Sequence, residues 1–284
     1  MLNEILTSMR PKQWYKNFVL FAGIIFSLNL FNVHMWITLF FSFIIFCMLS
    51  GSEYIFNDIM DKERDKIHPI KRNRPIASGK LHVLHAFIFA TLMVFSALVG
   101  AYLINVQFFV VSLAYFLLIV FYSLFLKHIA IVDVLTISMG FVIRAIAGCF
   151  AIKVFVSSWL IICTFLVALF LALGKRRHEL MLLENGAISH RKVLNDFSID
   201  LLEKMMTIVT SALIMSYSLY TFLSNNTWMM LTIPIIIYGI FRYIFLVHSK
   251  NAGGEPEILF KDIGMLTCII LWVISTVGII YVKK

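Results

Sequence analysis

Long uninterrupted apolar runs are the feature that most limits how this chain can fold. Hydrophobic residues make up 61% of its 284 residues and charged residues only 14%, whereas soluble domains usually carry about 25% charged residues. Each run is close to the roughly 20 residues that a helix needs to cross a bilayer. A spanning chain must form helices or a closed barrel, and continuous rather than alternating runs select helices. We therefore predict an all-α membrane protein, with residues 1–284 as a single integral-membrane domain.

Nine membrane-spanning helices are expected. Their approximate ranges are 17–32, 35–55, 82–103, 107–126, 130–151, 157–174, 205–224, 227–247 and 263–282. The first range is short, and the preceding Trp14 and Tyr15 can complete it at the membrane interface. A long charged loop follows the second helix and another follows the sixth. This echo suggests two four-helix units and a ninth helix, with both loops over one central cavity.

The connections between the runs alternate between strongly polar and nearly neutral. Most of the 24 Lys and Arg residues fall in the polar set, which comprises residues 1–16, 56–81, 127–129, 175–204 and 248–262. Basic residues of membrane proteins stay on the cytoplasmic side. We therefore expect a multi-pass protein of the cell membrane with a cytoplasmic N-terminus, cytoplasmic catalytic loops at about 56–81 and 175–204, and an external C-terminus. The same asymmetry explains the net charge of +9 without a nucleic-acid partner.

Four oxygen-bearing side chains are expected on one helix face after the second run. Asn57, Asp61 and Asp65 are spaced by four residues, and Asp58 precedes Asp65 by two turns. Such oxygens suit Mg²⁺, which binds one or two carboxylates together with substrate phosphates. Basic residues follow at once: Lys62, Arg64, Lys66, Lys71, Arg72 and Arg74. Together they indicate a diphosphate site, whereas a solvated loop that obeys the positive-inside rule would explain only the bases.

Two further basic clusters have both a functional and a structural interpretation. Lys175, Arg176 and Arg177 directly follow the sixth run, and such side chains bind phosphate. A basic cluster at this place also commonly marks the end of a spanning segment. The segment 10–17 precedes the first run, and its Trp, Tyr and Lys residues can serve either as a phosphate site or as an interfacial anchor.

Ionisable residues inside spans cost about 2.5–3.5 kcal/mol each unless they are partnered. Asp133 and Arg144 lie on the same predicted helix, about three turns apart, and so face the same way. With Tyr122 and Lys127 just before them, they are expected to line the cavity near its cytoplasmic mouth. The alternative is purely structural pairing, in which Glu53 of the second helix can take part.

These residues resemble a known family. The motif Asn57-Asp58-x-x-Asp61-x-x-x-Asp65 is similar to the first Asp-rich motif of the UbiA-type intramembrane prenyltransferase superfamily, and the resemblance extends over essentially the whole chain. RPKQWYKN at 10–17, HPIKRNRPIASG at 68–79, YSLFLK at 122–127, GKRRHEL at 174–180 and GGEPE at 253–257 resemble one branch, the decaprenyl-phosphate phosphoribosyltransferases. The resemblance implies about nine helices around a central cavity.

The branch implies a reaction and a role for each residue. Phosphoribose would pass from phosphoribosyl pyrophosphate to a polyprenyl phosphate with release of pyrophosphate, Mg²⁺ as cofactor and a place in cell-wall biosynthesis. Asp58, Asp61 and Asp65, helped by Asn57, would hold the metal and act in catalysis. The implied phosphate-binding residues are Lys71, Arg74, Lys175, Arg176 and Arg177, and those for the lipid phosphate are Lys12, Gln13, Lys16 and Asn17. Because the nucleophile is already an anion, the reaction needs no general base.

Two other functions stay open. Superfamily members that use a prenyl diphosphate usually carry a second Asp-rich motif after the sixth helix, where this chain begins with Lys-Arg-Arg. Asp196 and Asp200 have the spacing of such a motif but come about 20 residues later; if they reach the cavity, a prenyltransferase with an aromatic or lipid acceptor is favoured. The intramembrane Asp133 and Arg144 also suit a transporter, although a transporter does not explain why metal-type ligands and cations share one face.

Overall fold

Helices of two kinds build every described part of the chain. The computed structural model describes residues 2–69, 71–184, 194, 196–224, 226–249 and 261–282, and within these ranges all regular elements are α-helices or 3₁₀-helices. The chain divides into two compact units. The first comprises Met1–Leu124 and Ile143–Val156, and the second comprises Phe125–Val142 and Ser157–Lys284. The long helix α7 (Val132–Ala151) contributes its first half to the second unit and its last half to the first.

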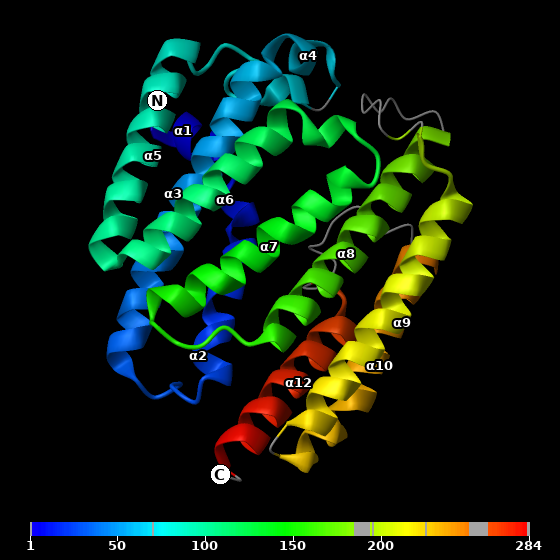
Figure 1. The fold of residues 1–284 in the computed structure, drawn as a ribbon. Helices are drawn as coiled ribbons and strands as arrows, with labels where there is room; N and C mark the ends of the chain where they lie inside the picture. The colour runs from blue at the N-terminus through cyan, green and yellow to red at the C-terminus, as the bar shows by residue number, and fades with distance from the viewer. Residues whose placement is uncertain are drawn as a thin grey trace. The chain divides into compact units, whose positions relative to one another are not determined.

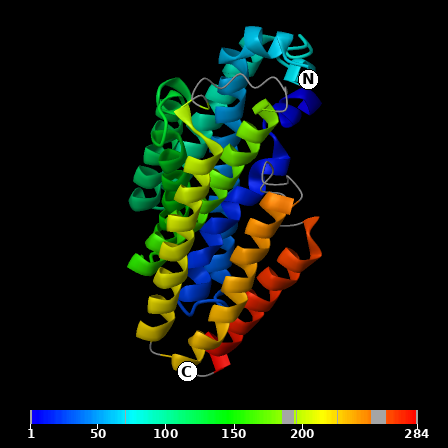
Figure 2. The ribbon, with the colours of Figure 1, turned by 90° about the vertical axis from the view of Figure 1, so that its right-hand side faces the viewer.

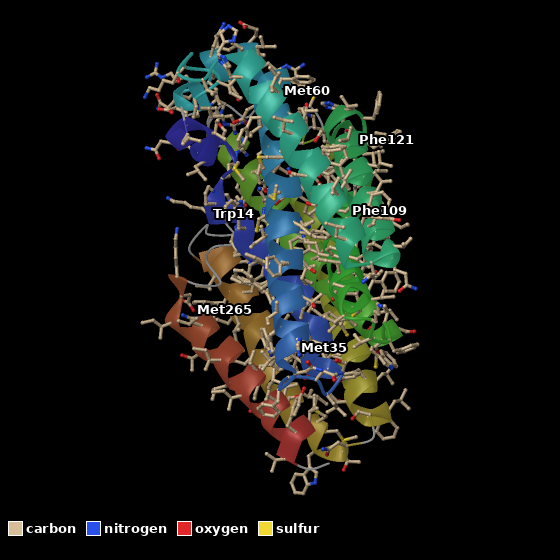
Figure 3. The ribbon with its side chains drawn as sticks, turned by 90° about the vertical axis from the view of Figure 1, so that its left-hand side faces the viewer. Trp14, Met35, Met60, Phe109, Phe121 and Met265 are labelled. Atoms are coloured by element: carbon tan, nitrogen blue, oxygen red, sulfur yellow. The ribbon has the colours of Figure 1, made fainter. Side chains whose placement is uncertain are left out.

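The first unit is built around one long helix. Its elements are α1 (Leu2–Ser8), η1 (Pro11–Phe21), α2 (Ala22–Phe26), α3 (Val33–Met60), α4 (Lys62–Ile67), η2 (Lys71–Asn73), α5 (Val83–Ile104), α6 (Val106–Leu124) and the end of α7. Helix α3 packs mainly on α5 and η1 (Figure 1). Met35 and Met60 mark its two ends in Figure 3. The N-cap Asn32 starts α3 by accepting a hydrogen bond from the backbone N–H of Met35.

The second unit is a bundle of long helices. Its elements are η3 (Leu126–His128), the start of α7, α8 (Ser158–Glu184), α9 (Ile199–Leu223), η5 (Thr227–Thr232), α10 (Ile233–Ser249) and α12 (Ile263–Val282). Helix α8 packs on α9, and α10 packs on α12, which Figure 2 shows as the neighbouring orange and red helices. Ser198 caps the start of α9 by accepting from the backbone N–H of Leu201.

Eight helices in the described residues are long and apolar enough to cross a membrane, which confirms the prediction of an all-helical membrane protein. Two of them continue well past the predicted C-terminal end of their span, and α9 begins six residues before the predicted start at residue 205. Helix α3 continues to Met60 and includes Asn57 and Asp58, and α8 continues to Glu184 and includes the whole Lys175–Glu179 cluster. The first residues of both expected loops are therefore helical.

The first predicted span, residues 17–32, is not one continuous α-helix. The chain forms the 11-residue 3₁₀-helix η1 followed by the 5-residue α2. Because a 3₁₀-helix rises about 2.0 Å per residue, against about 1.5 Å in an α-helix, the two pieces together extend roughly 30 Å. That is the thickness of a hydrocarbon core. A hydropathy profile only counts apolar residues, so it cannot show that a segment is extended as a 3₁₀-helix.

We expect η1 and α2 to cross the membrane and so to place the two termini on opposite sides. Green fluorescent protein fused before Met1 should fluoresce in the cytoplasm, whereas the same fusion after Lys284 should stay dark. Alkaline phosphatase, which is active only outside the cytoplasm, should work after Lys284 and not before Met1. A fluorescent C-terminal fusion in intact cells would contradict the crossing, because eight crossings return the chain to its starting side.

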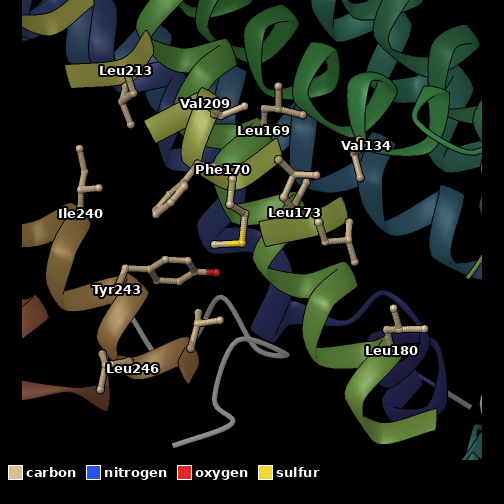
Figure 4. Close-up of a cluster of buried hydrophobic side chains, with 14 of the residues drawn as sticks. Val134, Leu169, Phe170, Leu173, Leu180, Val209, Leu213, Ile240, Tyr243 and Leu246 are labelled. Carbon is tan, nitrogen blue, oxygen red and sulfur yellow. The ribbon is translucent and has the colours of Figure 1, made fainter. Parts of the chain in front are cut away.

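In the core of the second unit, a tyrosine packs directly against a glycine. Figure 4 shows Tyr243 of α10 beside Phe170 of α8, with Val209 and Leu213 of α9 nearby, and the two aromatic rings are 4.9 Å apart between centroids. A Cβ atom on Gly174 of α8 would lie 2.5 Å from the Tyr243 hydroxyl. That hydroxyl is buried and has no hydrogen-bond partner among the described residues. The hydroxyl therefore occupies space in the core without making a hydrogen bond to a described residue.

Gly174→Ala is accordingly expected to lower the free energy of unfolding by about 1–3 kcal/mol through overpacking. Tyr243→Phe removes the clashing oxygen and no hydrogen bond, so the double variant should recover most of the loss. The thermal unfolding midpoint in one detergent, at one scan rate, measures both effects. Equal destabilisation of the single and double variants would show that the hydroxyl is not the obstacle.

Candidate active site

Two aspartates near the end of the long helix of the first unit converge on one point. The hydrogen bonds from the N–H of Asp61 to the carbonyl of Asn57 and from the N–H of Asp65 to the carbonyl of Asp61 carry the helical path from α3 into α4. Asp58 and Asp65, two turns apart, therefore share a face, as the spacing predicts. Both carboxylates are buried, with 2% and 4% of the residue exposed.

Two arginines from distant parts of the first unit bind these carboxylates. Arg74 Nη1 donates to Asp65 Oδ2 at 2.6 Å and to Asp58 Oδ1 at 3.1 Å. Arg10 Nη2 donates to the same Asp58 oxygen at 2.5 Å, and its guanidinium lies 4.8 Å from the centroid of the Tyr54 ring. We call Arg10, Asp58, Asp65 and Arg74 the acid–arginine cluster.

Apolar packing brings the arginines to this place. The segments that carry Arg10 and Arg74 are anchored on α3 and α5 through one buried apolar cluster, which includes Ile5, Met9, Ile55, Ile76 and Leu81. Gly79, at φ 79°, allows the loop after Arg74 to turn back towards α5.

Arg10 is held in an uncommon backbone conformation. It has φ 52° and ψ 65°, in the left-handed region, directly before Pro11. Such a conformation costs a residue other than glycine about 1–3 kcal/mol. The contact with Asp58 is one of the interactions that offset this cost.

The acid–arginine cluster fits a Mg²⁺ ion in one respect that the structure displays. One cationic nitrogen, Arg74 Nη1, touches oxygens of both Asp58 and Asp65, so the two carboxylates already converge on a single positive charge. Asp61 Oδ1 lies 4.0 Å from Arg64 Nη1, and Asn57 is half-buried. Within the described ranges no group of three or more His, Cys, Asp or Glu side chains is placed to hold a metal. Two carboxylates suffice for Mg²⁺ when substrate phosphates complete its coordination.

A second polar cluster of the first unit surrounds Arg144. Its Nε donates to Asn17 Oδ1 at 2.8 Å, and its Nη2 donates to the Tyr115 hydroxyl at 2.6 Å. The Tyr115 hydroxyl in turn donates to Glu53 Oε2 at 3.5 Å. At most 6% of any of these four residues is exposed. This Arg144 network supports the structural alternative for the intramembrane charge, and it uses the amide of Asn17, which the sequence assigned to a lipid phosphate.

The basic residues after the sixth span also bind carboxylates, within the second unit. Arg176 Nε lies 3.1 Å from Asp133 Oδ2, with both side chains almost fully buried, and Arg176 also pairs with Glu179. Arg177 donates to Glu203 Oε1 from Nε at 2.8 Å and from Nη2 at 2.7 Å, and His248 lies 3.3 Å from the same oxygen.

The remaining predicted site residues lie on several elements. Lys12 is exposed on η1, where Gln13 and Lys16 are half-buried; Lys71 of η2, Tyr122 of α6, Lys127 of η3 and Lys175 of α8 are also half-buried. Asp196 and Asp200, the candidate second Asp-rich motif, are exposed, and Asp200 pairs with Lys204 at 2.7 Å. The segment 253–257 lies outside the described residues.

Sequence reasoning included Arg10 in the basic segment 10–17 without giving it a role of its own, and it missed Tyr115 and Glu203. The signal for Arg10 was available, since an Arg-Pro pair directly before an apolar run marks a turn that can direct a cation towards the membrane surface. Tyr115 and Glu203 carried no such signal, because their partners are far away along the chain.

The fold and these clusters define an integral membrane protein with buried, ion-paired polar groups, and comparison with known proteins shows which kind. Residues 18–261 match the UbiA prenyltransferase family. The decaprenyl-phosphate phosphoribosyltransferase of Mycolicibacterium smegmatis is 29% identical over 98% of this chain and 92% of its own length, and that of Corynebacterium glutamicum is 30% identical over 98% and 87%.

The structure of a UbiA homologue from Archaeoglobus fulgidus bound to GPP and Mg²⁺ has the same fold, with a TM-score of 0.74 over 98% of this chain and 99% of that one, at 18% identity. The chain therefore belongs to the UbiA prenyltransferase family, as its motifs predicted, and is a membrane-embedded transferase.

Proposed function

We propose that this enzyme transfers phosphoribose from phosphoribosyl pyrophosphate to a polyprenyl phosphate in a Mg²⁺-dependent reaction. The observation that carries the proposal is the similarity, over nearly the full length, to transferases named for that activity. The acid–arginine cluster supports it, because a reaction between two anionic phosphates needs both metal-binding carboxylates and phosphate-binding cations.

The chemistry matches the groups in the cluster. The bond between the anomeric carbon and the diphosphate breaks, its electron pair leaves with pyrophosphate, and an oxygen of the lipid phosphate bonds to that carbon. The carbon passes through an oxocarbenium-like state, as in other glycosyl transfers. Asp58 and Asp65 would hold Mg²⁺, which when bound neutralises charge on the diphosphate. Arg10 and Arg74 present guanidinium groups, whose planar fork suits phosphate oxygens. The other residues to which the family resemblance assigns a role in metal, phosphate or lipid binding keep those roles as predictions.

The proposed location follows from charge. The acid–arginine cluster lies at the end of α3 that leads into the basic segment 56–81, which the positive-inside rule assigns to the cytoplasm. A soluble, highly charged sugar donor would reach the carboxylates from that side, in the cell membrane.

A second candidate is the transfer of a prenyl group from a prenyl diphosphate. The observation that favours it is the fold shared with the Archaeoglobus fulgidus homologue bound to GPP and Mg²⁺. The exposure of Asp196 and Asp200, and the pairing of Asp200 with Lys204, count against a second Asp-rich motif of the kind such enzymes use.

One assay separates the two. The purified protein is incubated with Mg²⁺, polyprenyl phosphates of several chain lengths and phosphoribosyl pyrophosphate labelled in its ribose. In parallel it receives labelled geranyl diphosphate with the same lipids and with aromatic acceptors. We expect label in the organic phase only from the ribose donor. Label from the prenyl donor alone would establish the second candidate instead.

A further inference from the structure

The two arginines of the acid–arginine cluster occupy the oxygens on which the proposed metal site depends. Arg74 lies on one oxygen each of Asp58 and Asp65, and Arg10 lies on the same Asp58 oxygen. Two carboxylates and two guanidinium groups are electrically balanced. A divalent cation that joins this cluster would meet two positive charges already in contact with its ligands, and at such distances that repulsion is large.

The burial of the four side chains shows which of them can move when a ligand binds. The Asp58 and Asp65 side chains are 2% and 5% exposed, whereas those of Arg10 and Arg74 are 31% and 25% exposed. The carboxylates are therefore fixed inside the protein, and the arginines lie on the open side, from which a soluble ligand must come.

Arg10 has a second contact that would keep it close if it left Asp58. Its guanidinium lies over the Tyr54 ring, and a ring face attracts a cation without consuming any N–H donor.

We propose that Arg10 and Arg74 exchange partners when the substrate binds. In the ligand-free protein they neutralise Asp58 and Asp65; when these carboxylates take a divalent cation, the two guanidinium groups move to the oxygens of the donor's diphosphate. Charge then stays balanced at both stages. The inference rests on the proposed function for its metal and its diphosphate, but not for the identity of the group transferred.

The exchange has a consequence that an ordinary structural ion pair lacks. Removing Arg74 frees an oxygen of Asp65, and removing Arg10 takes one of the two cations off the Asp58 oxygen. In both cases divalent cations should bind more tightly in the absence of substrate. The same change removes a diphosphate ligand, so a diphosphate should bind more weakly. A purely structural role predicts that both affinities fall together, because the carboxylates lose their support.

The test uses the purified full-length chain and two simple probes. Mn²⁺ binding without substrate is followed by the loss of the free-ion electron paramagnetic resonance signal. Inorganic pyrophosphate binding at saturating Mn²⁺ is followed by the shift in the thermal unfolding midpoint. The variants are Arg10→Gln and Arg74→Gln, with Lys80→Gln as the matched control. Lys80 is an exposed cation in the same basic segment, so its replacement removes an equal charge from the region.

We expect Mn²⁺ to bind about tenfold more tightly to Arg10→Gln, and pyrophosphate about tenfold more weakly, with shifts of the same signs in Arg74→Gln. Lys80→Gln should change each affinity by less than about twofold.

Unchanged or weaker Mn²⁺ binding in a folded Arg10→Gln or Arg74→Gln variant would overturn the exchange, as would a wild-type protein that binds no Mn²⁺ even with saturating pyrophosphate. The two arginine variants are independent, so the failure of one to fold leaves the other decisive. If the opposite shifts occur while ribose label never enters the lipid phase, the exchange stands and only the donor assignment fails.

Discussion

Asp58→Asn is expected to lower the rate of phosphoribosyl transfer by about 100-fold or more. The substitution keeps the size of the side chain but removes the negative charge that faces both Arg10 and Arg74. The Mg²⁺ that the carboxylate would hold is then lost, and with it the neutralisation of the leaving diphosphate. Loss of one preorganised electrostatic group at a reacting centre commonly costs 10²–10³ in rate. Transfer of ribose label into lipid, measured at several Mg²⁺ concentrations, gives the effect.

The chain offers a matched control for this variant. Glu63 lies five residues further along, with its side chain 76% exposed and paired with Lys66. That hydrogen bond lowers the pKa of the Glu63 carboxyl, so it is charged at neutral pH as Asp58 would be on a metal. Glu63→Gln therefore removes the same charge from the same region, and its rate should stay within about twofold of wild type. Equal losses in both variants would mean that only the net charge of the segment matters.

Arg144→Leu is expected to destabilise the protein by about 2–5 kcal/mol, because it leaves two buried polar groups without a hydrogen-bond partner. The replacement takes away the two bonds to Asn17 and Tyr115. It also removes the guanidinium that donates to the Tyr115 hydroxyl, which itself donates to Glu53. Since a whole domain is stable by only about 5–15 kcal/mol, much of the protein should fail to accumulate. Yield and the unfolding midpoint in detergent measure this.

A double variant separates the charge from the packing. Glu53→Gln in the Arg144→Leu background replaces the buried carboxyl group with a neutral amide. No buried negative charge then needs the lost cation, so part of the stability should return. Arg242→Leu serves as the control, because Arg242 pairs with Asp262 at a partly exposed site and should cost about 1 kcal/mol or less. An Arg144→Leu variant as stable as Arg242→Leu would show that the Arg144 network does not support the first unit.

The helical architecture could be predicted because the thickness of the bilayer sets the length of each apolar run in the sequence. The arrangement of the carboxylates at the end of α3 could be predicted too, since helical periodicity alone places Asp58 and Asp65 on one face. The form of η1 could not. A stretched 3₁₀ path depends on tertiary contacts, such as the approach of the Leu20 carbonyl to Gly148, where a Cβ atom would lie only 2.0 Å from that oxygen.

The composition of the candidate site was only partly predictable. Arg10 reaches Asp58 from 48 residues away, and no local pattern encodes such a distance. Lys175, Arg176 and Arg177 look like one cluster in the sequence. In a helix, however, successive side chains point about 100° apart, so Arg176 meets Asp133 and Arg177 meets Glu203.

The buried charges of α7 gain their partners at different times during synthesis. Asn17 and Tyr115 precede Arg144 in the chain, so both are already in the membrane when Arg144 arrives. Asp133 instead precedes Arg176. At a synthesis rate of about 5–20 residues per second, Asp133 would wait for several seconds, at a cost of about 2.5–3.5 kcal/mol while unpaired in lipid. The insertion machinery should therefore release α7 and α8 into the bilayer as a hairpin rather than one helix at a time.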